Sequence, residues 1–169
     1  MIIKNSNINI AIDIMREAAQ WLIDKGERMW RLEDLTAEKI MNGISEENVY
    51  VGFEDSLPIA AMILQWQDTI FWEQIKPFES GFIHKLCVKR KYAGKGYAKE
   101  MLAFAEAECR KRKIGFLRLD TAGDRPKLCS FYESLGFKQV QRRLVGPNAS
   151  DMAFYEKKIL SRDSIEVDC

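Results

Sequence analysis

Two glycines separated by one residue, Gly94 and Gly96, lie in a short basic loop of the chain. An apolar segment precedes this loop, and a segment with apolar residues at helical spacing follows it. Glycines at the start of a helix expose backbone N–H groups beside the positive end of the helix dipole, and this arrangement binds phosphate or pyrophosphate. The loop therefore predicts a ligand that carries phosphate groups.

Two common phosphate-binding motifs do not fit this loop. A Walker P-loop needs G-x-x-x-x-G-K-[ST], and the chain has no Gly-Lys-Ser/Thr here. A dinucleotide fingerprint needs G-x-G-x-x-G early in the chain, and the sequence that begins at Gly94 lies in mid-chain and lacks the third glycine. A different phosphate-binding fold must therefore position the loop.

The apolar pattern predicts the elements that surround the loop. Helical spacing predicts helices at about residues 8–24, 36–41 and 96–113, and a fourth that Asp124 caps and Gly136 ends. Apolar runs predict strands at 49–53, 59–66, 81–89, 116–121, 137–141 and 152–158, with a few more strand residues at 70–73. This order predicts a mixed α/β fold of the α+β-like kind, with a largely antiparallel sheet and one parallel crossover.

The composition suits one globular domain. The chain has 169 residues, of which 47% are hydrophobic and 30% charged. We expect a single domain over residues 1–160 and a polar C-terminal tail over 161–169. The formal net charge is +1, which gives no bulk attraction to nucleic acid or to an anionic membrane.

No segment predicts a membrane span, a signal peptide or a metal site. No apolar run approaches the roughly 20 residues that cross a bilayer. The four cysteines are far apart and form no C-x-x-C pair, so we expect reduced thiols. A single histidine, His84, cannot complete the usual zinc spacings. We expect a soluble cytoplasmic protein without a metal.

Two segments together resemble the GNAT superfamily of N-acetyltransferases. Ala93-Gly-Lys-Gly-Tyr-Ala98 is similar to the family's acyl-CoA loop, [Q/R]-x-x-G-x-[G/A], at Gly96 and Ala98. Phe131-Tyr-Glu-Ser-Leu-Gly-Phe137 is similar to the second family signature, F-Y-x-x-x-G-F. The resemblance covers nearly the whole chain. It implies an acyl-CoA N-acyltransferase fold with a twisted six- to seven-stranded sheet, helices on both faces and a splayed central strand pair.

The resemblance also implies acetyl-CoA as co-substrate. Backbone N–H groups of residues 94–98 would hold its pyrophosphate, and the strand before the loop would pair with pantetheine like an added strand. The same strand backbone would polarise the thioester carbonyl. The cofactor-binding residues implied are Leu86, Cys87, Val88, Ala93, Gly94, Lys95, Gly96, Tyr97, Ala98 and Lys99.

The chain departs from the family pattern at two positions. Residue 93 is alanine where relatives have Gln or Arg, and Arg125 stands where the family often has Asn. Alanine at 93 removes one side-chain contact to the ligand, and either Lys91, Lys95 or Arg90 replaces it or the affinity for CoA is reduced. Arg125 stands at a position where relatives make a contact on the pantetheine side.

Acyl transfer to an amine needs a neutral amine and a proton for the leaving thiolate. The resemblance places Tyr132 at the position of the family's general acid. For the base we expect His84, with Asp120 as the next candidate. An acyl-cysteine route through Cys87 is the alternative to direct transfer in a ternary complex, but no activating partner for that thiol is evident.

The amine acceptor is not identified by the sequence. Relatives wall the acceptor pocket with the first two helices and a strand loop, which here supply aromatic and acidic side chains: Trp30, Trp66, Asp68, Trp72 and Glu73. These suit an amine cation on a small molecule, a protein or a peptide. The resemblance is compatible with a homodimer. The alternative function is a non-catalytic acyl-CoA-binding or regulatory module on the same fold.

Overall fold

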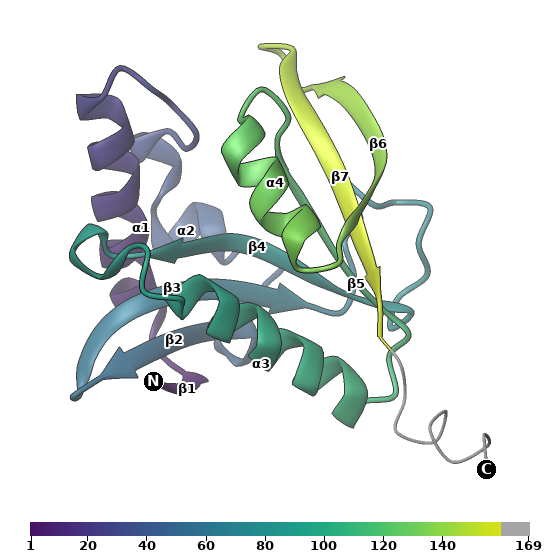
Figure 1. Cartoon of the computed structure of the whole chain (residues 1–169), viewed down its shortest axis with the longest axis horizontal. Coiled ribbons are helices and arrows are strands. Elements are labelled where there is room, and N and C mark those ends of the chain that lie inside the picture. Colours follow the sequence, from purple (N-terminus) through teal and green to yellow (C-terminus); the bar gives the residue numbers. More distant parts are fainter. Residues whose placement is uncertain (160–169) are drawn as a thin grey trace. The chain divides into compact units, whose positions relative to one another are not determined.

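The computed structural model describes residues 1–159 and divides the chain into two compact units. The first unit holds residues 1–65 and 84–104, and the second holds residues 66–83 and those from 105 onward. The expected domain end at residue 160 and the tail at 161–169 lie outside the described residues. Figure 1 labels the helices and strands of both units.

A long amphipathic helix organises the core of the first unit. Helix α1 (Ile8–Asp24) begins where the side chain of Asn7 accepts a hydrogen bond from the N–H of Asn9. Its apolar stripe is buried and packs against the hairpin of β2 (Val49–Glu54) and β3 (Leu57–Gln65). The bounds of α1 agree with those predicted from the spacing of its apolar residues.

The hairpin carries one strand more than the sequence predicts. Strand β1 (Ile2–Asn5) pairs antiparallel with β2, opposite the edge that β2 shares with β3. Asp55 and Ser56 close the β2–β3 hairpin with φ values of 48° and 65°, the left-handed geometry of a tight two-residue turn. Helix α2 (Ala37–Ile40) is a single turn, capped by the side chain of Thr36, and the 3-10 turns η1 (Leu32–Asp34) and η2 (Glu46–Asn48) lie on either side of it.

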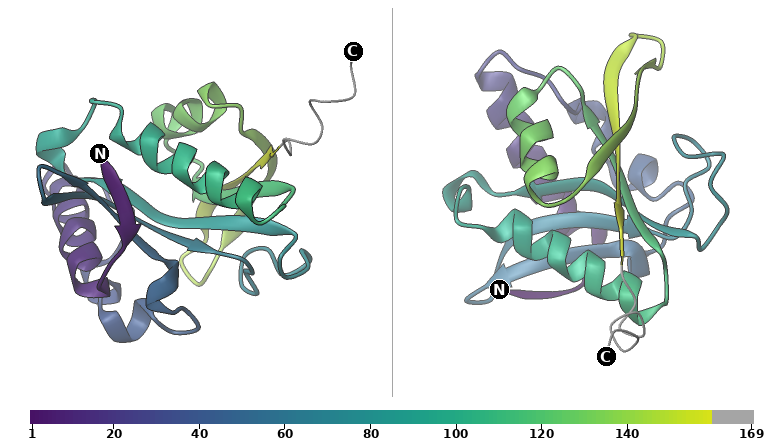
Figure 2. Two further views of the ribbon diagram at one scale, coloured as in Figure 1. Left: turned by 90° about the horizontal axis from the view of Figure 1, so that it is seen from below. Right: turned by 45° about the vertical axis from the view of Figure 1, so that its right-hand side comes forward.

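The second unit is built on β5 (Phe116–Ala122), β6 (Lys138–Val145) and β7 (Ser150–Lys158). Strand β7 pairs antiparallel with both β5 and β6, and Figure 2 shows β6 and β7 as a long two-stranded ribbon. Helix α4 (Pro126–Ser134) packs against β5 and β6. This unit has its own aromatic cluster of Trp72, Phe82 and Phe154.

Two elements belong to both units. Strand β4 (Ser80–Val88) passes from the second unit to the first between Ile83 and His84, and its first four residues pair in parallel with β5. Helix α3 (Tyr97–Lys111) begins in the first unit and ends in the second. The strands form one seven-stranded sheet in the order β1-β2-β3-β4-β5-β7-β6. The predicted mixed α/β class with one parallel crossover is confirmed.

Two local expectations are wrong. Residues 70–73 form turns and not a strand, because the Asp68 carboxylate accepts the backbone N–H groups of Ile70 and Phe71 and bends the chain. Asp124 does not cap α4. Arg125 occupies the N-cap position without a side-chain hydrogen bond to the helix, and Pro126 begins the helix with its fixed φ.

Among residues 1–159, none of the helices combines the length and the apolar character that a bilayer crossing requires.

Candidate functional site

The two glycines of the basic loop adopt the backbone geometry that the phosphate prediction needs. Gly94 has φ +75° and Gly96 has φ +88°, values that side-chain-bearing residues rarely adopt. A Cβ added at either glycine would meet no heavy atom of the described residues within 4 Å, so the backbone faces open space. The loop therefore has room for a bulky anionic ligand at its backbone.

The start of α3 supplies the N–H groups for such a ligand. The carbonyl of Gly96 accepts the first helical hydrogen bond, from Glu100 at 3.1 Å, so Gly96 is the residue from which the helix starts. The first N–H groups of a helix have no partner within it, and a helix of 15 residues has a developed dipole. Tyr97, Ala98 and Lys99 are the residues that carry those groups, as the sequence predicts.

Side chains of helix α1 contact the segment that leads into the loop. The carboxylate of Glu17 accepts a hydrogen bond of 3.1 Å from the backbone N–H of Arg90, in the 3-10 turn η3 (Arg90–Tyr92). The guanidinium of Arg90 lies 4.1 Å from the ring centroid of Trp21. The ammonium groups of Lys91 and Lys95 likewise lie 5.7 Å and 5.5 Å from the ring centroid of Tyr92. All three side chains are exposed, so each remains a candidate to replace the side-chain contact missing at Ala93.

The strand that precedes the loop contains a buried thiol. Cys87 belongs to the hydrophobic core of the first unit, and burial raises the pKa of its thiol to about 12. A thiol with that pKa is almost wholly protonated at neutral pH, and the thiolate is the nucleophile. This observation argues against an acyl-cysteine route. Leu86 and Val88, on either side of it, are half-buried.

Tyr132 lies in the second unit, on the last turn of α4. Its residue exposure is 7%, and its ring makes edge contacts with Phe131 at 5.3 Å and Phe137 at 5.9 Å between centroids. The ring is therefore fixed by packing inside its own unit. A phenol held in this way is a suitable proton donor for a reaction at its hydroxyl.

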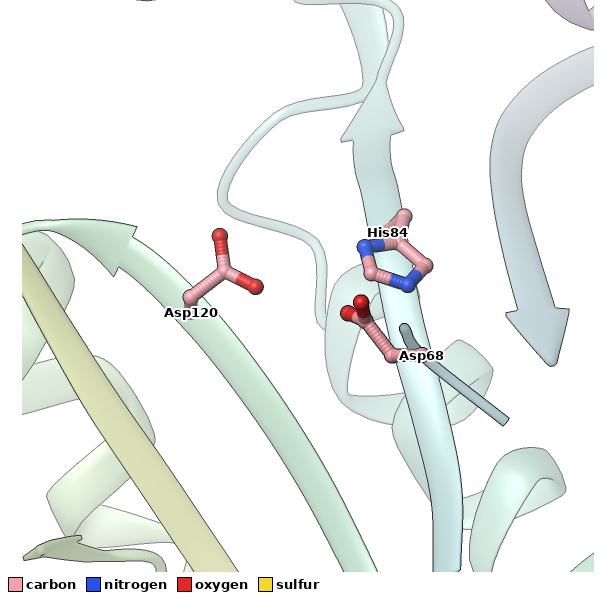
Figure 3. Close-up of side chains that lie close together, drawn as sticks. All are labelled: Asp68, His84 and Asp120. Carbon is pink, nitrogen blue, oxygen red and sulfur yellow. The ribbon is translucent and has the colours of Figure 1, made fainter. Parts of the chain in front are cut away.

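His84 is accompanied by two carboxylates. Asp68, His84 and Asp120 each offer one oxygen or nitrogen, and these atoms all lie within 4.8 Å of one another (Figure 3). The chain itself explains the proximity of two of them. Ile83 pairs with Leu119 across β4 and β5, and the next residues on those strands are His84 and Asp120.

The sequence does not predict that Asp68 belongs to this cluster. The sequence predicts for it a place in the wall of an acceptor pocket. Its exposure is 8%, and its Oδ1 accepts the N–H groups of Ile70 at 2.9 Å and Phe71 at 2.8 Å. These bonds fix the carboxylate in one orientation. No sequence signal places Asp68 beside His84, although a buried aspartate ahead of two apolar residues is the pattern of a side-chain-capped turn.

The residues predicted to wall an acceptor pocket separate into different environments. Trp72 is part of the core of the second unit, where its ring contacts Phe82 and Phe154, so its assignment to the pocket is wrong. Trp66 is covered by the guanidinium of Arg112 at 4.4 Å. The ammonium of Lys85 lies over the ring of Trp30, 5.0 Å from its centroid. The side chain of Glu73 is exposed.

Comparison with known proteins finds acetyltransferases. The family model described as "Acetyltransferase (GNAT) family" matches residues 15–137. The uncharacterized N-acetyltransferase YesJ of Bacillus subtilis (strain 168) is 29% identical over 154 residues, which cover 86% of this chain and 82% of YesJ.

Solved structures show the same fold at low identity. The PaiA N-acetyltransferase of Thermoplasma acidophilum, in complex with coenzyme A, has a TM-score of 0.68 at 23% identity over 93% of this chain and 98% of its own. The ribosomal-protein-S18-alanine N-acetyltransferase of Escherichia coli has a TM-score of 0.68 at 17% identity over 94% of this chain and 93% of its own. With the family match extending over most of its length, the chain belongs to the acetyltransferase (GNAT) family.

Proposed function

We propose that this chain is an N-acetyltransferase that moves an acetyl group from acetyl-CoA to a primary amine, within one domain over residues 1–160. The observation that carries the proposal is the pair of positive-φ glycines, Gly94 and Gly96, open to space at the first turn of a 15-residue helix. The PaiA relative, which was solved with coenzyme A, supports the choice of ligand.

In this proposal the first unit binds the donor. The N–H groups of residues 94–98 donate hydrogen bonds to the pyrophosphate oxygens, while Lys91 and Lys95 add positive charge. The backbone of Leu86, Cys87 and Val88 hydrogen-bonds the pantetheine arm and polarises the thioester carbonyl. Small size at Gly96 and Ala98 lets the phosphates approach the backbone.

The proton transfers fall to His84 and Tyr132. His84 takes a proton from the acceptor ammonium, directly or through a water molecule, and Asp68 and Asp120 stabilise the imidazolium that forms. The neutral amine attacks the thioester carbon, and the C–S bond breaks as Tyr132 gives its proton to the leaving thiolate. The nitrogen loses its remaining extra proton as the amide forms, and that proton returns through water to the Tyr132 phenolate. The high pKa of the Cys87 thiol supports direct transfer over an acyl-enzyme.

The acceptor is proposed only as a class, a primary amine on a small molecule or on a protein or peptide. The ribosomal-protein-S18-alanine N-acetyltransferase of Escherichia coli supports the second kind. Release of free thiol from acetyl-CoA, measured with a panel of amines and of peptides with free N-termini, tests the proposal. An amine-dependent rate supports it. Acetyl-CoA binding without turnover on any acceptor would favour a non-catalytic acyl-CoA-binding module.

A further inference from the structure

A buried tyrosine of β7 contacts the helix that carries Tyr132. Tyr155 is fully buried, and its hydroxyl donates a hydrogen bond of 2.9 Å to the carboxylate of Glu133. The side-chain oxygen of Gln139 lies farther from the same hydroxyl, at 3.4 Å. A phenol has one hydrogen to donate, and the bond to a charged acceptor is the stronger one. The main anchor of Tyr155 is therefore Glu133, the residue that follows Tyr132 on α4.

Burial, followed by interactions with the side chains of Cys129 and Glu133, raises the pKa of the Tyr155 phenol above its ordinary value. Tyr155 is consequently a neutral donor throughout the neutral pH range. Cys129 and Glu133 are four residues apart and thus lie on one face of the helix. The thiol of Cys129 donates its own hydrogen bond to the carbonyl of Ala122, at 3.7 Å.

Tyr155 also touches the ring of Tyr132 itself. The two ring centroids are 6.2 Å apart with 38° between the ring planes, and Phe137 meets the Tyr132 ring edge-on at 5.9 Å. The ring of Tyr132 is thus held by these two rings and by that of Phe131, while its helix is held by the Tyr155 hydroxyl. Both constraints originate inside the second unit.

We infer that Tyr155 is a positioning residue for the reaction, acting through Tyr132. By fixing the last turn of α4 through Glu133, it keeps the Tyr132 hydroxyl in the orientation in which it donates a proton to the leaving thiolate. The inference rests on the proposed function, because it needs Tyr132 to be the acid. Placement errors of about 1 Å at a reacting group cost large factors in rate, so a single anchor can matter to turnover.

A double-mutant cycle on Tyr155 and Tyr132 tests this role. Tyr155→Phe keeps the ring contact and removes the anchor, and Tyr132→Phe removes the acid. We expect Tyr155→Phe alone to lower kcat about fivefold, the equivalent of one hydrogen bond, with the KM for acetyl-CoA unchanged. In the Tyr132→Phe background the same change should have no effect on kcat, because no acid remains to be positioned. Glu133→Ala, at an exposed position, should behave like Tyr155→Phe and carries the test if the buried variant does not fold.

Three outcomes would overturn the inference. A fivefold loss that persists in the Tyr132→Phe background would show that Tyr155 acts on the fold in general, and so would weaker acetyl-CoA binding. Wild-type turnover in both Tyr155→Phe and Glu133→Ala would show that the anchor is dispensable. Wild-type turnover in Tyr132→Phe itself would remove the proposed acid, and the inference would fall with it. The first two outcomes leave the proposed function intact.

Discussion

Glu17 on α1 binds the backbone N–H of Arg90 at 3.1 Å, and this bond fixes the entry of the loop that contains Gly94 and Gly96. The loop is otherwise exposed from residue 94 to residue 96. A loop that is ordered before the ligand arrives loses less entropy on binding. In the proposed donor site, Glu17 therefore supports the loop from a helix that is distant in sequence.

The first prediction concerns this bond. Glu17→Ala should weaken acetyl-CoA binding about fivefold, because the loop must then be ordered at the expense of binding free energy. Glu17→Gln is the matched control, since its amide oxygen can still accept from Arg90, and it should bind within about twofold of wild type. Calorimetric titration of the three proteins measures the effect. Equal affinity in all three would show that the loop needs no such support.

The second prediction concerns Tyr132. Tyr132→Phe should lower kcat about 100-fold, the lower part of the range for general acid catalysis, while the Kd for acetyl-CoA stays unchanged. Steady-state thiol release and calorimetry measure the two quantities separately. Phe131→Leu, a change at the neighbouring ring, serves as the control for altered packing of α4. A Tyr132→Phe variant with wild-type kcat would assign the acid to another group.

The third prediction separates the two roles of Asp68. Asp68→Ala should lower the free energy of unfolding by about 2 kcal/mol, because the hydrogen bonds from the N–H groups of Ile70 and Phe71, each worth about 1 kcal/mol, are lost. Asp68→Asn keeps an oxygen for those bonds and removes the charge near His84. It should therefore fold with nearly wild-type stability and still lower kcat/KM about tenfold, by loss of charge stabilisation in the proton transfer.

Denaturant melts and steady-state kinetics on both Asp68 variants distinguish these roles. If Asp68→Asn keeps wild-type kcat/KM, the carboxylate serves only the turn. A large loss of stability in Asp68→Asn would instead show that the negative charge itself holds the loop.

The fourth prediction follows from the thiol of Cys87. Its pKa is about 12 in the folded chain against 9.0 for an ordinary thiol, so the folded state holds the proton more tightly than the unfolded state. This contribution to stability is complete below pH 9 and is lost as the pH rises towards 12. Over that interval one proton of difference between the two states lowers the free energy of unfolding by ~1.4 kcal/mol per pH unit. Cys87→Ala should remove this contribution, so its free energy of unfolding should fall less steeply with pH than that of the wild type.

Two measurements check the state of Cys87. Denaturant melts between pH 9 and 11 on wild type and Cys87→Ala give the slope. Mass spectrometry of the wild type after incubation with acetyl-CoA alone should show no acetyl adduct of the protein. A stable adduct on Cys87 would contradict direct transfer and restore the acyl-cysteine route.

Local patterns predicted most of the fold. The bounds of α1 followed from one apolar stripe and an asparagine cap, and the β2–β3 hairpin followed from two apolar runs around a polar turn. Strand β1 was missed because its four residues are mostly exposed and are held by pairing with β2, far along the chain. A strand that forms because it pairs with a neighbouring strand need not have an apolar pattern in its own sequence.

The candidate site divides in the same way. The glycine loop and Tyr132 lie in contiguous motifs, so the sequence alone proposes a role for both. The approach of Asp68 to His84 and Asp120 was not predicted, because three separate segments supply the three side chains. The contact of Tyr155 with Glu133 joins β7 to α4 and is likewise created by folding. From the sequence alone, Tyr155 is predicted only as one more apolar residue of a strand.

The most direct test of the account is calorimetric titration of the wild type with acetyl-CoA, alongside Gly96→Glu and Gly43→Glu. Gly43 is a matched control, since it has φ +79° and open space at its Cα like Gly96 but lies on another loop, after α2. Both variants therefore suffer similar backbone strain. We predict micromolar binding by the wild type and by Gly43→Glu, and loss of binding in Gly96→Glu. No binding by the wild type, or undiminished binding by Gly96→Glu, would contradict the proposed donor site.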